Sequence, residues 1–412
     1  MKRTLTLLLS SLALAAAGWA SSTAAPVDER WSLDVLPLTS PAATNSAQPQ
    51  LTARGDRVVL SWMERSGDRA TLAFAERTLD GWSEPRAVAS GTNFFVNWAD
   101  VPSVVRLADG SLAAHWLQAS APSGYAYDVR LSFSKDDGRT WSASTTPHHD
   151  GYPVEHGFAS LFQVPGQSGL GLIWLDGREM TRDGHPGMGR GNMNLRAAMF
   201  DRTGSQSSET LIDGLVCECC PTAVAEAADG PIVAFRNRTQ DQIRDIYVSR
   251  LIDGHWTEPT SVHDDQWRIA ACPVNGPALS ARGRDVAIAW FTAAGDRGRV
   301  FASFSRDSGR TFGAPIAIED AGAVGRVDVE LLASGKAIVS WIEFADQHSQ
   351  FRVRRIDPSG ARTQSTGVAS ISAARAGGYP RMAVHGDELV FAWTDTSGQA
   401  PQVRTAVARI QP

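Results

Sequence analysis

The segment VVLSW at residues 58–62 is a short apolar run that ends in an aromatic residue. Similar segments recur as LAAHW (112–116), LGLIW (170–174), PIVAF (231–235), VAIAW (286–290), AIVSW (337–341) and LVFAW (389–393). Their closing aromatic residues are separated by 54, 58, 61, 55, 51 and 52 residues. A regular period of this length is typical of propellers and solenoids. We therefore expect one structural unit to recur along the whole chain.

Each repeat has the pattern of four short antiparallel strands. Five repeats carry a proline 13 or 14 residues before the aromatic anchor, at Pro49, Pro102, Pro221, Pro277 and Pro380. Proline suits the first residue of a strand, where no N–H is needed for the ladder. Alternating strands such as YDVRLSFS (127–134) follow the anchors, and glycine-containing turns precede a last short strand. Because such sheets cover one another when they stack around an axis, the sequence predicts an all-β propeller with seven blades, or six as the alternative.

The two ends of the chain are expected to close this ring. Residues 30–38, RWSLDVLPL, resemble the fourth strands GWSEPRAVA (81–89) and HWTEPTSVH (255–263). The N-terminal strand therefore supplies the outer edge of the last blade, and residues 30–412 form one propeller domain. Residues 1–20 have the basic start, apolar run and small residues of a secretory signal peptide, which predicts a periplasmic or secreted protein.

Charge and hydropathy argue against nucleic-acid binding and against a membrane span. The formal net charge is -5 over 412 residues, and this balance offers no basic footprint for a nucleic-acid backbone. After the signal segment, no stretch approaches the ~18 consecutive apolar residues of a transmembrane helix. We expect neither nucleic-acid binding nor a membrane span in the mature chain.

Two turns have the pattern Ser-x-Asp-x-Gly-x-x-aromatic. The residues concerned are Ser134, Asp136, Gly138 and Trp141 in the first turn, and Ser305, Asp307, Gly309 and Phe312 in the second. These turns resemble the Asp boxes, or BNR repeats, of the sialidase (neuraminidase) superfamily. An Asp box is structural, because its Ser and Asp side chains bond turn backbone while its glycine takes a positive φ. The segments CECCPT (217–222) and CPVNGP (272–277) resemble a sub-group of sialidase-like exported bacterial proteins.

The sialidase resemblance implies a pocket on the channel-mouth face. Such a pocket holds three arginines that bind a carboxylate, a tyrosine nucleophile assisted by a glutamate, and an aspartate that acts as the acid. The chain departs from this pattern, since Gln48, Pro49 and Gln50 stand where an Arg-Ile-Pro motif is expected. The repeat register places four candidate catalytic residues on this face: Asp100, Asp128, Glu155 and Tyr379. For Asp128, a repeat-structural role is the alternative, because Asp245 occupies the equivalent place.

Arginines gather on the same predicted face. Candidates for binding an anionic ligand, with one aromatic residue for stacking a sugar, are Arg178, Arg236, Arg238, Arg268, Arg326, Arg381 and Trp98. Guanidinium groups bind carboxylates through paired hydrogen bonds, which suits an acidic sugar. The alternative for each arginine is a salt bridge between blades.

The four cysteines, Cys217, Cys219, Cys220 and Cys272, occupy one narrow part of the chain. Neighbouring blades are expected to bring Cys272 close to the other three, which allows a disulfide. Soft thiolates also favour Cu(I) or Zn, and His156 and His148 could extend such a site. The spacing matches no standard zinc motif.

These observations leave three functions open. The first is an exported sialidase-like propeller that recognises an anionic or glycan ligand and, if it is an enzyme, hydrolyses it as an exo-sialidase. The second is an extracytoplasmic copper- or zinc-binding or thiol-redox protein that uses the Cys and His residues. The third is a non-catalytic scaffold for a protein partner.

Overall fold

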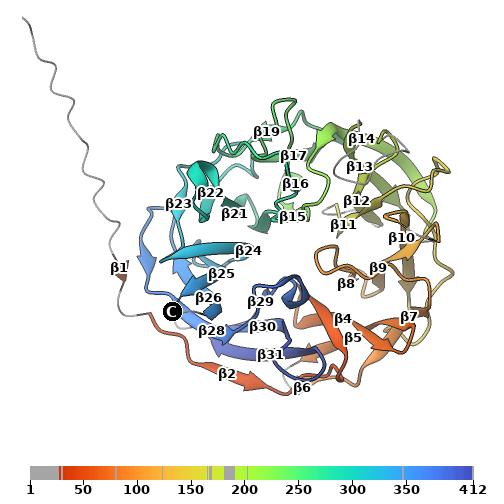
Figure 1. The fold of residues 1–412 in the computed structure, drawn as a ribbon, viewed down its shortest axis with the longest axis horizontal. Coiled ribbons are helices and arrows are strands. Elements are labelled where there is room, and N and C mark those ends of the chain that lie inside the picture. The colour runs from red at the N-terminus through yellow and green to blue at the C-terminus, as the bar shows by residue number, and fades with distance from the viewer. Residues whose placement is uncertain are drawn as a thin grey trace, which may run out of the picture.

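The structure is a computed structural model that describes residues 27–28 and 31–410, apart from residues 79–80, 123, 165, 167–168, 181–190, 202 and 346–347. The predicted signal peptide lies outside the described residues. The described chain is all-β, with seven sheets arranged as blades around one axis (Figure 1). The seven-bladed propeller predicted from the repeat is therefore confirmed, and the alternative of six blades is excluded.

The strands of the first three blades follow the chain from the axis outwards. The first blade contains β3 (Ser46–Arg54), β4 (Arg57–Ser66), β5 (Arg69–Thr78), β6 (Gly81–Trp82) and β7 (Arg86–Gly91). The second contains β8 (Ser103–Arg106), β9 (Leu112–Ala119) and β10 (Tyr127–Ser134). The third contains β11 (His156–Phe162), β12 (Leu170–Asp176), β13 (Met193–Phe200) and β14 (Gln206–Val216). In the second blade, an isolated bridge between Leu131 and Thr145 replaces the predicted fourth strand.

Blades four to seven repeat this order. The fourth contains β15 (Ala223–Ala227), β16 (Gly230–Arg236), β17 (Ile246–Ile252), β18 (His255–Trp256) and β19 (Thr260–Ser261). The fifth contains β20 (Ala278–Arg282), β21 (Asp285–Thr292), β22 (Arg299–Ser305) and β23 (Ile316–Ala317). The sixth contains β24 (Gly322–Leu331), β25 (Ala337–Ala345), β26 (His348–Ile356), β27 (Arg362–Thr363), β28 (Thr366–Ser370) and β1 (Val27–Asp28). The seventh contains β29 (Arg381–His385), β30 (Glu388–Asp395), β31 (Gln402–Arg409) and β2 (Val35–Leu38).

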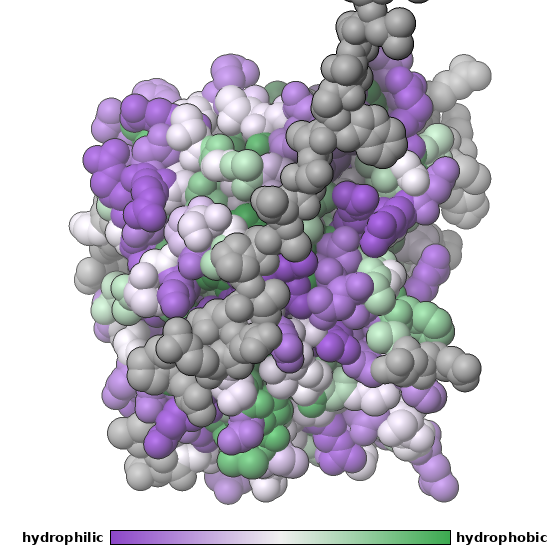
Figure 2. All heavy atoms as spheres, turned by 90° about the vertical axis from the view of Figure 1, so that its left-hand side faces the viewer, coloured by the Kyte–Doolittle hydropathy of each residue, from purple (hydrophilic) through white to green (hydrophobic). Residues whose placement is uncertain are grey.

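Two 3-10 turns lie in loops between these strands, η1 (Ala294–Asp296) and η2 (Arg375–Gly377). Among the described residues, no helix has the length and apolar character needed to span a membrane. On the side of the ring seen in Figure 2, hydrophilic residues predominate and hydrophobic residues form small separate groups.

The N-terminal segment closes the ring as predicted. Strand β2 pairs antiparallel with β31, with Val35 opposite Ala408 and Leu38 opposite Thr405. Just before β2, Trp31 and Leu33 are buried in the apolar core between the last two blades. Both ends of the chain therefore contribute to the seventh blade, and β1 adds a short parallel pairing to the sixth.

The aromatic anchors lie on the second strand of each blade and fill the space between blades. Trp174 on β12 packs against Val129 and Leu131 of the preceding blade, and Trp62 on β4 packs against Val390 of the seventh blade. A buried indole N–H needs an acceptor. An acidic residue two positions later accepts this hydrogen bond in three blades: Trp62 to Glu64 (2.7 Å), Trp174 to Asp176 (2.7 Å) and Trp341 to Glu343 (3.0 Å).

The predicted Asp boxes form two turns with the same hydrogen bonds. In the first, Ser134 Oγ accepts from the Gly138 N–H (2.9 Å), and Asp136 Oδ1 accepts from the Thr140 N–H (2.9 Å). In the second turn, Ser305 and Asp307 make the equivalent bonds at 2.9 Å each. Gly138 has φ +77°, and a Cβ there would lie 2.3 Å from Phe74 Cζ of the preceding blade. The Asp boxes therefore fix turns against neighbouring blades.

Candidate functional site

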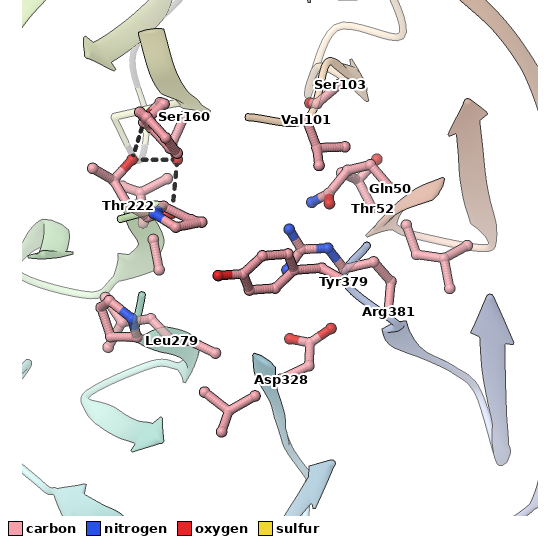
Figure 3. A pocket seen from close by; sticks show the side chains of 18 of the residues that line it. Gln50, Thr52, Val101, Ser103, Ser160, Thr222, Leu279, Asp328, Tyr379 and Arg381 are labelled. Carbon is pink, nitrogen blue, oxygen red and sulfur yellow. Dashed lines mark hydrogen bonds between the residues drawn. The ribbon is translucent and has the colours of Figure 1, made fainter. Parts of the chain in front are cut away.

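The innermost strands of all seven blades surround a central cavity of about 230 Å³. Its polar lining includes Gln50, Ser160, Thr222, Asp328 and Arg381 (Figure 3). A second, adjoining cavity is lined by Arg54 and Glu226, which form an ion pair of 2.8 Å between the first and fourth blades. The channel thus joins strands that are far apart in the sequence.

Two carboxyl groups enter the channel from β24. Asp328 accepts hydrogen bonds from the backbone N–H groups of Val329 and Met382, each at 2.9 Å. Burial nevertheless raises the pKa of Asp328 above its usual range. Burial, together with the charge of Asp328, raises the pKa of Glu330 to about 8. Both groups therefore hold their protons more tightly than exposed carboxyls do.

The channel-mouth face contains several residues in the left-handed region of backbone conformation. Gln48 (φ 59°), Phe158 (φ 50°), Val274 (φ 46°) and Arg326 (φ 54°) come from four different blades. A β-branched residue such as Val274 is especially unfavourable at positive φ. Strain of this kind persists only where the surrounding structure imposes it, and it is concentrated at functional sites. These four residues make the channel-mouth face a candidate functional surface.

Arginines and aromatic rings pack together over the channel. Tyr379 is buried and donates from its hydroxyl to the Val274 carbonyl (2.7 Å), while Trp98 stacks on its ring at 6.1 Å. The Arg326 guanidinium lies 4.7 Å from the Trp98 ring centre, and that of Arg381 lies 5.3 Å from the Tyr379 ring centre. Trp98 and Tyr379 are thus parts of a packed layer.

Most of the other predicted arginines are engaged by the protein itself. Arg236 is buried and donates to the carbonyls of Arg244 (2.6 Å), Phe291 (2.7 Å) and Asn275 (2.9 Å). Arg326 donates to three carbonyls of the loop that contains η2, those of Ala373, Ala374 and Gly378. Arg268 is exposed and donates to the carbonyl of Asp241 (2.8 Å). Arg178 binds Asp176 through two nitrogens.

Two of the candidate acids meet at a buried phenol. The Tyr127 hydroxyl lies 2.7 Å from Glu155 Oε1 and 3.2 Å from Asp100 Oδ2. Burial raises the pKa of Asp100 to about 7 and that of Glu155 to about 8. Tyr127 is fully buried under Phe95, whose ring stacks on it at 3.9 Å. Of this group, Asp100 lines the central cavity.

The four cysteines form a thiol cluster, by which we mean Cys217, Cys219, Cys220 and Cys272. Cys217 Sγ lies 3.3 Å from Cys220 Sγ and 3.9 Å from Cys219 Sγ, and all four thiols are free. Cys272 enters from the next blade and contacts Cys219, and this contact lowers the pKa of the Cys272 thiol. Cys217 and Cys220 are buried, whereas Cys272 is exposed. The cluster therefore reaches from the protein interior to solvent.

Two arginines and one buried glutamate surround the buried end of the thiol cluster. Arg244 donates from Nη1 to Cys217 Sγ (3.2 Å) and to Glu218 Oε2 (2.6 Å), and Arg238 pairs with the same glutamate. Although burial opposes ionisation, the neighbouring thiols and Arg244 hold the pKa of Cys217 well below its ordinary value. A thiolate, rather than a thiol, is the form that binds metals and reacts as a nucleophile.

His156 and Asp128 belong to a different group, the imidazole cluster, which consists of Asp128, His148, Asp150, His156 and Asp176. The rings of His148 and His156 stack face to face at 3.6 Å. Among the described residues, two sets of possible metal ligands combine His156 with carboxylates, and neither set includes a cysteine. The histidines therefore do not extend the thiol cluster in the way that the sequence analysis suggested.

Comparisons with known proteins identify a shared fold and no family. No family model matches the chain, and no curated protein matches it. The polysaccharide lyase Uly1 is similar in structure, with a TM-score of 0.54 and 11% identity over 96% of this chain and 94% of that one. A protein of unknown function from Dyadobacter fermentans has a TM-score of 0.51 and 12% identity over 92% and 97%. The NanB sialidase of Streptococcus pneumoniae is more distant, with a TM-score of 0.47 and 9% identity over 91% and 94%. At such low identity, the likeness extends to the propeller fold alone.

Sequence reasoning missed several residues of these groups, above all Tyr127, Asp150 and Glu218. Tyr127 opens the alternating strand β10, and Glu218 lies inside the CECC segment. One signal was available for Glu218, because a charged residue between closely spaced cysteines has to find a partner if it is buried. No comparable signal marked Tyr127, since Asp100 and Glu155 lie 27 and 28 residues away in the chain. Asp150 lies between its partners His148 and His156 in the sequence, so the segment HHDGYPVEH (148–156) was a signal that sequence reasoning overlooked.

Proposed function

We propose that this protein binds a thiophilic metal ion at the thiol cluster, with Cu(I) as the first candidate and Zn²⁺ as the second. The observation that carries this proposal is the convergence of Cys217, Cys219 and Cys220, whose sulfur atoms all lie within 4.8 Å of one another. In a tetrahedral zinc–thiolate site with Zn–S bonds of about 2.3 Å, sulfur atoms are about 3.8 Å apart. The observed separations of 3.3 and 3.9 Å are close to this value.

The charges around the cluster support metal binding. Several thiolates and one ion would leave negative charge in the interior, which needs nearby compensation. Arg244 contacts Cys217 directly and favours its thiolate, whereas burial and the neighbouring Cys217 raise the pKa of Cys220, so a metal ion has to displace the proton from that thiol. Copper is favoured over zinc because the Cys-x-Cys-Cys spacing departs from that of known zinc motifs, while soft thiolates also select Cu(I).

The exposed end of the cluster supports reversible exchange of the ion. Cys272 is exposed and contacts the half-buried Cys219, so an ion could pass from solvent to the buried thiols through these two residues. We therefore infer a role in holding or transferring a metal ion, which in an exported protein would take place outside the cytoplasm.

The test is a titration of the reduced protein with Cu(I) under anaerobic conditions, in competition with a chromophoric copper chelator. We expect one ion per chain. Cys217→Ser should weaken binding at least about 100-fold, more than the loss of an outer-shell partner does. Cys272→Ser, at an exposed position, should weaken binding less than Cys217→Ser does. Arg268→Ala on the same face is the control and should leave the affinity unchanged. A parallel titration with Zn²⁺ ranks the two ions.

A count of free thiols in protein isolated without reductant can contradict the proposal. If alkylation and mass spectrometry find all four cysteines in disulfides, and the reduced protein binds neither ion, the thiol cluster has a purely structural role. Circular dichroism of each variant shows whether the fold is retained.

Recognition of an anionic glycan receives less support from the site. The guanidinium groups of Arg236 and Arg326 are each engaged by three backbone carbonyls, and Trp98 is packed under Arg326. Glycan binding, glycoside hydrolysis and a scaffold role therefore remain predictions from the sequence.

A further inference from the structure

The imidazole cluster contains two nitrogen atoms that face one carboxylate without a hydrogen bond. His148 Nε2 and His156 Nδ1 are buried and have no hydrogen-bond partner within the described part of the chain. They lie 3.9 and 3.6 Å from Asp128 Oδ1, beyond hydrogen-bond distance. A buried polar atom left unpaired is unfavourable, so this arrangement needs an explanation.

The Nε2 atom of His156, on the side of the ring away from Asp128, contacts Asp150. His156 Nε2 lies 3.0 Å from Asp150 Oδ2, so a hydrogen on Nε2 is donated to this carboxylate, and Nδ1 is the atom that would offer a lone pair to a metal on the Asp128 side. Arg178 in turn lies 3.3 Å from Asp150 Oδ2. A carboxylate that orients a histidine in this way is the usual outer-shell partner of a metal-binding imidazole.

The charge of the cluster also favours a dication. Asp128 lies near Nδ1 of His156, Asp150 and Asp176 lie near Nε2, and the Arg178 guanidinium pairs with the latter two. Metal binding requires both imidazoles to be neutral, and in that state three carboxylates against one guanidinium leave two negative charges without compensation. One divalent ion would neutralise them.

We propose that His148 Nε2, His156 Nδ1 and Asp128 Oδ1 form a second metal site that takes a divalent ion of the zinc type. These three atoms lie within 4.8 Å of one another. Two ligand atoms on one tetrahedral zinc ion are about 3.4 Å apart, given bonds of about 2.0–2.1 Å. The distances of 3.6 and 3.9 Å from Asp128 therefore require only a small contraction.

Metal binding requires one further adjustment. A metal lies in the plane of each imidazole that binds it, whereas the two rings are now parallel, with an angle of 6° between their planes. The rings must therefore turn toward each other and give up their stacking. Asp128 is 27% exposed, so the ion can enter from solvent on that side.

This site is separate from the thiol cluster in both position and chemistry. Its ligands come from β10, the loop before β11, and β11 itself, whereas the thiols precede β15 and β20. Nitrogen and oxygen ligands suit Zn²⁺, while thiolates suit Cu(I). The existence of the second site therefore does not depend on metal binding at the thiol cluster.

The experiment uses Co²⁺ as a spectroscopic substitute for Zn²⁺ in the full chain. Cobalt at the imidazole cluster should give ligand-field bands without a sulfur charge-transfer band, and Zn²⁺ should displace it. His148→Ala and Asp128→Asn should each lower this affinity at least 100-fold, and Asp150→Asn by 10- to 100-fold. Cys217→Ser should leave the sulfur-free bands in place. His149→Ala, a neighbouring histidine that is exposed and bonded to Gln206, is the matched control and should change nothing.

Two results would overturn the proposal. The first is the absence of sulfur-free cobalt bands, which would make the cluster a network of hydrogen bonds and ion pairs. The second is the survival of these bands in both His148→Ala and Asp128→Asn, which would place the ion elsewhere. Thermal denaturation of each variant identifies any loss of fold, and Asp150→Asn keeps the test valid if His148→Ala does not fold.

Discussion

Glu330 faces the channel from β24 next to Asp328, and its environment disfavours the charged form. Because the pKa of Glu330 is raised from 4.5 to about 8, the folded chain holds a proton that the unfolded chain has lost. The stabilisation is complete below about pH 4.5 and is lost as the pH rises through about 8. We expect the free energy of unfolding to fall between these values by up to about 1.4 kcal/mol per pH unit for one proton.

The measurement is urea denaturation at several pH values for the wild type and for Glu330→Gln. The variant cannot ionise, so its unfolding free energy should depend less on pH. Glu84→Gln at an exposed position serves as the control and should keep the slope of the wild type. Equal slopes for all three proteins would show that Glu330 ionises freely in the folded state.

At the scale of single elements, the Asp-box turn after β10 depends on the space around its glycine. Gly138→Ala places a methyl group 2.3 Å from Phe74 Cζ, at φ +77°. Gly254→Ala has a similar φ of +81° and meets nothing within 4 Å. We expect Gly254→Ala to cost about 1–2 kcal/mol for the backbone alone, and Gly138→Ala to cost a further 1–3 kcal/mol, roughly, for overpacking.

Thermal and chemical denaturation of the two variants measures this difference. Equal losses of stability would mean that the turn moves away from Phe74 at little cost. In that case the Asp box would be a local turn rather than a contact that fixes the position of one blade against the next.

At the scale of the whole molecule, the ring depends on the closing strand β2. Trp31 is 5% exposed and packs into the core between the sixth and seventh blades. Trp31→Ala should lower the unfolding free energy by about 3–5 kcal/mol, as for other buried large-to-small changes. Removal of residues 31–38 should destabilise the entire domain, because the seventh blade would then expose its outer edge.

Leu36→Ala is the control for this prediction, since Leu36 on β2 is 61% exposed and should contribute less than about 0.5 kcal/mol. Urea unfolding followed by tryptophan fluorescence and by circular dichroism measures each variant. A truncated chain as stable as the wild type would contradict the role of β2 in closure.

The sequence by itself determined the recurring blades, the closing strand and the Asp boxes, and it favoured seven blades over six. These features are encoded locally, because the anchors such as Trp174 recur every 51 to 61 residues and each Asp box closes its own turn within a few residues. Proline placement followed the same register: Pro102, Pro277 and Pro380 come directly before β8, β20 and β29, whereas Pro49 lies at a bulge within β3.

Only the tertiary structure decided which side chains meet on the channel-mouth face. The repeat register could bring Cys272 near the other cysteines, since it depends on the spacing of neighbouring blades. It could not assign the guanidinium of Arg236 to backbone carbonyls, or stack His148 on His156 away from the thiols. Such pairings depend on rotamers and on loops that follow no repeat, and burial then sets the charge of each group through its particular neighbours.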